Sequence, residues 1–172
     1  MITRKLSVKK EETGSEPITL EMLQEHLSID FDDHATLLNV FIPAAREQVE
    51  KYTGLSLIDS DITARWESLT EKELPYGPVK EIVSVQDKDD EDITSHTVEG
   101  IDFLSITANS ETPVVVKYKT GYDVVPFSLQ LAIIKLASDH FENRNGIAIG
   151  GSSLPNDWKA TCRPHSRKSW LG

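Results

Sequence analysis

The chain has a single cysteine and no long hydrophobic run. Among its 172 residues only Cys162 carries a thiol, so no internal disulfide can form, which agrees with a reducing compartment. No window approaches the ~18 consecutive apolar residues that a membrane-spanning helix needs. Residues 1–17 carry positive charge but lack the apolar stretch of a secretory signal. We therefore expect a protein that neither spans a membrane nor is secreted.

Basic residues are scarce outside the two ends of the chain. The formal net charge is −10, from 18 basic and 28 acidic residues. Four of the basic residues lie in residues 1–10 and four in residues 158–172, and neither segment contains an acid. The body between them is therefore strongly acidic, and it should repel duplex DNA within a Debye length of ~8 Å at physiological salt. Only the two ends are expected to contact phosphate or an acidic protein.

Helical periodicity is absent at the start of the chain and appears soon after it. Residues 1–16 are rich in Lys, Glu, Ser and Gly, and they predict a disordered arm. A short helix is predicted at about 19–27, with Thr19 as its N-cap. A longer helix is predicted at about 33–53 because apolar residues recur on one face. These residues are Leu37, Leu38, Phe41, Ile42, Ala45, Val49 and Tyr52.

The longer helix has start and stop signals and one residue that disagrees with it. Asp32 or Asp33 can cap its N-terminus, and Gly54 suits its C-terminal end. Pro43 removes a backbone donor in its middle. Because the apolar face keeps its phase across the proline, we predict a kink near Asn39 rather than two separate helices.

Residues 56–122 change to the pattern of β-strands. Four short β-rich runs, "LIDSDITARWES", "VKEIVSVQ", "DFLSI" and "PVVVKYKTGY", are separated by the turn-forming stretches "PYGP", "DKDDED" and "TANSETP". The run "VKEIVSV" alternates apart from one slip. No helix-length segment separates these runs, so a small antiparallel meander is predicted.

Helical spacing returns at about 126–144, so the fold class is α+β. Pro126 fits the first turn of this helix and Asn145-Gly146 its end. Its predicted inward face consists of Leu129, Ala132, Ile133, Leu136, Ala137, His140 and Phe141. Residues 146–172 then predict a flexible Gly/Ser loop and a basic tail.

The strongest chemical candidate is a possible zinc site around His140. His140 and Glu142 have the His-x-Glu spacing of zinc deaminases, which also need two downstream cysteines. Only Cys162 is present, and His165 occupies the position of the second cysteine. A site of His140, Cys162 and His165 is chemically conceivable, but a histidine beside a helix's apolar face is usually structural. We therefore predict no metal and no catalytic residue.

Other enzyme and ion-binding patterns fail in detail. The acidic run from Asp87 resembles a calcium loop, but its sixth and twelfth positions are Asp92 and Val98 instead of Gly and Glu. A solvated hairpin tip is the better interpretation. The sequence also contains no Gly-x-Ser-x-Gly elbow and no phosphate-binding loop ending in Lys-Ser/Thr.

The C-terminal tail combines tryptophan with basic residues. Tryptophan and arginine are favoured anchors of protein interfaces, and a loose tail would expose them. The alternative is a tail that is simply disordered. We predict a docking segment formed by Trp158, Lys159, Arg163, Arg167, Lys168 and Trp170.

Taken in order, these segments resemble the head–tail connector proteins of long-tailed phages and prophages, also called adaptor or head-completion proteins. The resemblance covers about residues 17–155. Its most specific pieces are "AAREQVEKYTG", "LPYGPVKEI", "YKTGYDVVP" and "HFENR". The tail beyond Pro155, with "CRPHSRKSW", is longer and more basic than is usual in the family.

The resemblance implies a structural, non-enzymatic virion protein without a cofactor. Such proteins form a dodecameric ring beneath the portal, extend the DNA channel, and present a platform to the stopper or tail-completion protein. They are made in the host cytoplasm and act at the head–tail interface, where the tail would dock on the portal. The implied fold is a helical bundle with a small inserted β-domain, so residues 17–145 would form a single connector domain.

Two alternatives from other classes remain. One is a monomeric module that binds phage or host proteins. The other is a small metal-dependent enzyme that uses His140, Cys162 and His165. The ring requires surfaces that bind further copies of the chain, the monomer does not, and the enzyme requires a metal site.

Overall fold

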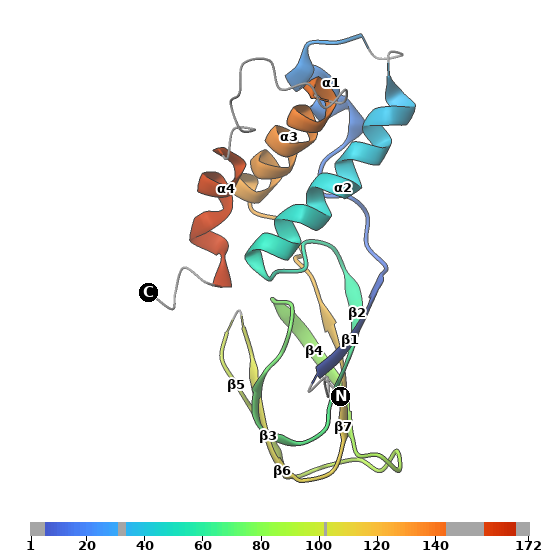
Figure 1. Ribbon diagram of the computed structural model, residues 1–172, viewed down its shortest axis with the longest axis vertical. Helices are drawn as coiled ribbons and strands as arrows, with labels where there is room; N and C mark the ends of the chain where they lie inside the picture. The colour runs from blue at the N-terminus through green and yellow to red at the C-terminus, as the bar shows by residue number, and fades with distance from the viewer. Residues whose placement is uncertain (1–5, 31–33, 102, 144–156, 168–172) are drawn as a thin grey trace. The chain divides into compact units, whose positions relative to one another are not determined.

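The computed structural model describes residues 6–30, 34–101, 103–143 and 157–167 (Figure 1). It has an α+β fold, as predicted, and it divides into two compact units. Residues 1–15 and 58–123 form the first, here called the β unit. Residues 16–57 and 124–172 form the second, here called the helical unit. None of the described helices is long and apolar enough to cross a membrane.

The β unit contains two antiparallel sheets rather than the single meander that we predicted. The larger sheet has the order β1-β2-β7-β4. Its strands are β1 (Leu6–Glu12), β2 (Ser60–Trp66), β7 (Val114–Thr120) and β4 (Val79–Gln86). The smaller sheet has the order β3-β6-β5, with β3 (Leu69–Glu73), β6 (Ser105–Ser110) and β5 (His96–Glu99).

Alternating side chains of β2 and β7 form the core of the β unit. Ile62, Ala64 and Trp66 of β2 are buried, and the intervening residues point outward, as the period of a strand requires. The slip in the alternation of β4 has a structural cause, because the register of its pairing with β7 shifts between Ile82 and Ser84. A bulge there leaves Val83 55% exposed.

The prediction of a disordered arm is wrong for residues 6–12. They form β1, which pairs with β2 over its whole length. Beyond the strand, the N–H groups of Thr13 and Gly14 both donate to the carbonyl oxygen of Asp59, at 2.8 and 2.9 Å. The backbones approach so closely that a Cβ at position 14 would lie 2.6 Å from the nitrogen of Asp59. Backbone pairing, not apolar burial, holds this segment.

The helical unit consists of α1 (Leu20–Leu27), α2 (Ala35–Thr53), α3 (Phe127–Glu142), α4 (Asp157–Cys162) and a 3-10 turn (Arg163–His165). Helices α2 and α3 run antiparallel (Figure 1). Accordingly, the His34 ring at the start of α2 packs against the Phe141 ring at the end of α3. Their buried faces supply much of the core, with Leu38, Ile42, Ala45, Val49, Leu129, Ile133, Leu136 and Ala137.

The helix ends follow the local signals in part. Thr19 caps α1 by accepting from the N–H of Met22, and Gly54 ends α2 with φ +79°, so both predictions are confirmed. Helix α2 continues through Pro43 as one helix. Its N-cap is His34, whose side chain makes no capping bond. The proposed caps at 32 and 33 and the helix end at 145–146 lie outside the described residues.

Candidate functional site

The first part of the C-terminal tail is folded onto the helical unit instead of being loose. Trp158 of α4 is only 8% exposed, and its ring packs on the Tyr52 ring in a T-shaped arrangement with centroids 5.5 Å apart. Lys159 Nζ lies 5.4 Å from the centroid of the same indole. The indole is therefore part of the helical unit's own packing, and the expectation that the tail exposes Trp158 is wrong.

Polar contacts extend this attachment along α3. The Lys135 ammonium of α3 lies 2.5 Å from a carboxylate oxygen of Asp157. Further along, the Ser128 hydroxyl and the His165 imidazole form a hydrogen bond of 2.7 Å. Because residue 157 contacts residue 135 and residue 165 contacts residue 128, the segment 157–165 runs back along α3. The predicted flexibility of the tail therefore does not apply to this segment.

The basic residues of the tail differ in how accessible they are. Arg163 is exposed and Lys159 is half-buried. Arg167 is also half-buried, and this burial lowers the pKa of its guanidinium. Lys168 and Trp170 lie outside the described residues. Arg163 is therefore the most accessible of the described basic tail residues, and Lys159 and Arg167 are each half-buried.

His140 has a structural environment. Its Nε2 lies 2.9 Å from the side-chain nitrogen of Gln48 on α2, and its ring lies 5.9 Å from that of Phe41. Glu142 is exposed at the end of α3. The His-x-Glu spacing therefore places one residue between α2 and α3 and the other in solvent, as the structural interpretation expects.

The other two residues of the conceivable metal site are also engaged. Cys162 is buried, and burial raises the pKa of its thiol to about 11, so the thiolate that binds metal is disfavoured at neutral pH. The His165 imidazole is hydrogen-bonded to the Ser128 hydroxyl. Among the described residues, no group of three or more His, Cys, Asp or Glu side chains could hold a metal ion.

The acidic run after β4 forms a turn held by its own first residue. Asp87 Oδ1 accepts hydrogen bonds from the backbone N–H groups of Asp89 and Glu91, at 2.8 and 3.1 Å. The Asp87 N–H in turn donates to the carbonyl oxygen of Glu91 at 3.0 Å. The first carboxylate thus stabilises a hairpin tip, which agrees with the interpretation made from the sequence.

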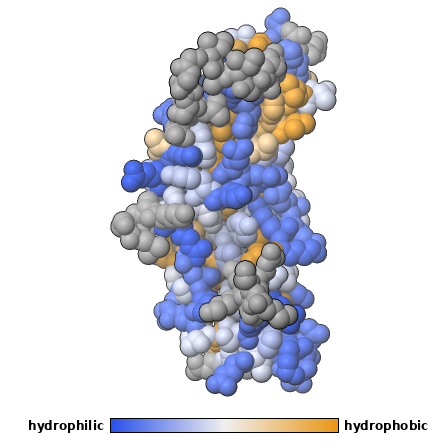
Figure 2. All heavy atoms as spheres, in the orientation of Figure 1, coloured by the Kyte–Doolittle hydropathy of each residue, from blue (hydrophilic) through white to orange (hydrophobic). Residues whose placement is uncertain are grey.

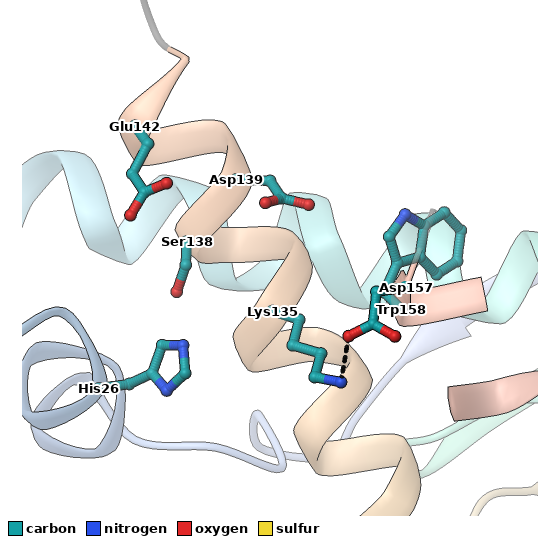
Figure 3. Close-up of a pocket in the computed structure, with 7 residues that line it drawn as sticks. All are labelled: His26, Lys135, Ser138, Asp139, Glu142, Asp157 and Trp158. Carbon is teal, nitrogen blue, oxygen red and sulfur yellow. Dashed lines mark hydrogen bonds and ion pairs between the residues drawn. The ribbon is translucent and has the colours of Figure 1, made fainter. Parts of the chain in front are cut away.

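A polar pocket of about 160 Å³ lies between α1, α3 and the start of α4 (Figure 3). Its lining combines three carboxylates with a lysine, a histidine, a serine and the indole: Asp139, Glu142, Asp157, Lys135, His26, Ser138 and Trp158. Burial, reinforced by the charge of Glu142, raises the pKa of Asp139. This pocket could not be predicted from the sequence, because its residues come from three separate helices.

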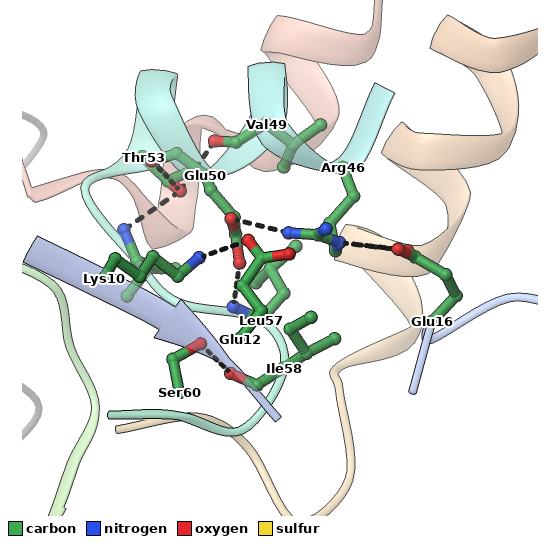
Figure 4. A network of polar contacts seen from close by, with 11 residues as sticks. Lys10, Glu12, Glu16, Arg46, Val49, Glu50, Thr53, Leu57, Ile58 and Ser60 are labelled. Atoms are coloured by element: carbon green, nitrogen blue, oxygen red, sulfur yellow. Dashed lines mark hydrogen bonds and ion pairs between the residues drawn. The ribbon is translucent and has the colours of Figure 1, made fainter. Parts of the chain in front are cut away.

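A buried ion-pair network joins the start of the helical unit to α2 (Figure 4). The Arg46 side chain is 2% exposed, and its Nε lies 3.0 Å from a carboxylate oxygen of Glu16. One of its terminal nitrogens lies 2.9 Å from Oε2 of Glu50, whose Oε1 accepts from the N–H of Leu57 at 2.6 Å. The network ties both ends of the 16–57 segment to α2, so we assign it a structural role.

The helical unit also exposes two hydrophobic surfaces. The first, called here the α3 stripe, comprises Val124, Phe127 and Leu131, which are 77%, 84% and 41% exposed. The second, called here the α2 patch, centres on Val40, which is 59% exposed, with Leu37 and Ala44 half-buried beside it. Figure 2 shows hydrophobic side chains gathered over the N-terminal half of α2. Surfaces of this kind mark sites of protein association.

Two comparisons with known proteins match the chain. The model of the phage gp6-like head-tail connector protein family matches residues 17–157. The chain belongs to this family, and it is therefore a head–tail connector of the virion's head–tail interface. A search of curated proteins finds no match.

Solved structures share the fold. A chain from the neck of an empty gene transfer agent particle, computed with C6 symmetry, has a TM-score of 0.70 and 17% identity, over 92% of this chain and 95% of its own. A chain from the virion of the native particle has a TM-score of 0.66 and 17% identity, over 91% and 94%. A chain from the native neck computed with C12 symmetry has a TM-score of 0.65 and 17% identity, over 92% and 94%.

Proposed function

We propose that this chain is the subunit of a dodecameric ring that sits beneath the portal, joins head to tail and extends the DNA channel. The observation that carries the proposal is the family match over residues 17–157. The α+β fold supports it, because chains with this fold occur in particle necks computed with C6 and C12 symmetry. The helical unit would act as the bundle of the connector, and the ring would present a platform to the stopper or tail-completion protein.

The charge of the chain suits a channel through which DNA moves. The net charge of −10 arises because a strongly acidic body outweighs two basic ends, and a ring of such subunits would not hold the phosphate backbone. DNA would pass without sequence-specific binding. A connector of this kind needs neither a catalytic residue nor a cofactor.

The accessible basic residues of the tail are the proposed contact with the portal. Arg163 and Lys159 carry the proposal among the described residues, and Arg167, Lys168 and Trp170 extend it. Trp158 contributes by holding α4 in place rather than by touching the portal. Deleting the tail would therefore be a poor test, since it would remove an indole that packs within the helical unit.

Co-sedimentation with the cognate portal tests the proposal. The wild-type chain is expected to sediment with portal rings, and the double variant Lys159→Gln/Arg163→Gln should bind more weakly. The matched control Lys72→Gln/Lys88→Gln removes the same charge from the β unit and should bind normally. Equal binding by the two double variants would refute the tail contact. Absence of wild-type binding would instead favour the monomeric binding module.

A further inference from the structure

The α3 stripe is a side of a helix that carries no charge. From residue 124 to residue 134 the sequence contains no acidic or basic residue, and the first charge is Lys135. Phe127 and Leu131 are one turn apart on the outer face of α3, opposite the buried face that contains Leu129 and Ile133. Phe127, at 84% exposed, is covered by no described residue of the chain.

We propose that the α3 stripe of one copy packs against the α2 patch of the next copy, forming the repeating contact of the ring. This inference rests on the proposed ring function. Successive subunits of a closed ring meet through two different surfaces, because a surface that pairs with itself produces only a dimer. The helical unit supplies two such hydrophobic surfaces, one around Phe127 and one around Val40.

The charge of the chain explains why this contact should be apolar. Copies that each carry a net charge of −10 repel one another in solution. Repulsion is weakest where the facing surfaces carry no charge, as in the segment 124–134. Because the same segment has no basic side chain to bind a phosphate backbone, the surface suits a protein neighbour rather than DNA.

The size of the stripe also fits a ring better than a free dimer. The three exposed side chains present on the order of 300–400 Å² of apolar surface, estimated from their exposed fractions. A stable interface buries about 800 Å² on each partner. Two free copies should therefore associate weakly through this contact, and closure of the ring should stabilise it.

Cross-linking between cysteine variants tests the pairing directly. Phe127→Cys and Val40→Cys proteins are mixed and treated with a short bismaleimide, which captures brief encounters. The native Cys162 should contribute little, because it is buried and burial raises the pKa of its thiol to about 11. We expect several-fold more cross-linked dimer than from a mixture of Phe127→Cys with Glu25→Cys, which places the second thiol on the exposed side of α1. Equal yields would overturn the inference, as would Phe127→Cys cross-linking best to itself.

Charged variants test the same contact in the assembled ring. Phe127→Asp and Val40→Asp should each abolish rings on the portal, whereas the control Asn39→Asp adds the same charge beside the patch and should leave them intact. A mixture of the two variants should stop at dimers, because each retains one intact surface. If wild-type rings form and Phe127→Asp forms them equally well, this inference fails alone. If wild-type protein forms no ring with portal, the proposed function itself fails.

Discussion

Replacing Arg46 by methionine should destabilise the helical unit severely. Methionine keeps much of the volume of the arginine stem but removes the partner of two carboxylates. Glu50, with a side chain only 5% exposed, would lose the Arg46 cation while staying buried, whereas the 31% exposed Glu16 side chain can turn to water. Arg46 is thus required mainly to neutralise one buried carboxylate.

The expected cost follows from that burial. Removing one partner of a buried ion pair typically costs ~3–5 kcal/mol. Because Glu16 is partly solvated and Glu50 keeps the N–H of Leu57, the lower end of that range, about 3 kcal/mol, is expected. A small domain has only ~5–15 kcal/mol of total stability. With a urea m-value of ~1–3 kcal/mol/M, the unfolding midpoint should fall by roughly 1–3 M.

Urea unfolding followed by circular dichroism at 222 nm measures this loss, because all the described helices lie in the helical unit. Arg46→Lys is the matched control: it keeps the charge but loses the planar fork, so it should fall between the wild type and Arg46→Met. Adding Glu50→Gln to Arg46→Met should restore part of the stability, since an amide still accepts from Leu57 without a buried charge. An Arg46→Met protein within about 0.5 kcal/mol of the wild type would refute the reasoning.

Three further predictions concern the pocket, a helix end and the tail. Burial raises the pKa of Asp139, so its ionisation opposes folding; Asp139→Asn should stabilise the protein at neutral pH, and the gain should vanish below the usual aspartate pKa of 3.8 in unfolding curves measured against pH. Gly54→Ala should cost ~1 kcal/mol in thermal unfolding because φ is +79°, although a Cβ there would meet Arg167 at an ordinary 3.6 Å. Trp158→Ala should cost ~3–5 kcal/mol and expose α4 to proteolysis, since the indole packs on Tyr52; unchanged proteolysis would contradict an anchored tail.

The helices could be predicted because their signals are local. Thr19 caps α1 and Gly54 ends α2, and each depends only on residues close to it in the sequence. The apolar spacing of α2 and α3 likewise identifies the faces that the structure buries. β1 could not be predicted, because the alternation in "LSVKKEE" ends after Val8 and the strand depends on backbone pairing with β2, more than 45 residues away in the chain. The short β3 and β5 were also missed, because nearly all of their side chains are exposed and show no apolar alternation.

The candidate site was predicted only in part because exposure is a property of the fold. Trp158 is followed by basic residues, a pattern that favours an exposed side chain, but Tyr52, which is distant in the sequence, covers its indole. The inward face of α3 was predicted correctly at Leu129 and Ile133, whereas the opposite side gave no warning that Phe127 and Leu131 would have no cover among the described residues. Periodicity identifies the buried face of a helix, but it does not show whether a second apolar face is exposed and binds another protein.

Electron microscopy of the chain mixed with its portal tests the central claim most directly. The account predicts a closed ring of twelve copies that is coaxial with the portal, with neighbouring copies in contact through the α3 stripe. Portal rings without added density, with the chain still monomeric in the same mixture, would contradict it.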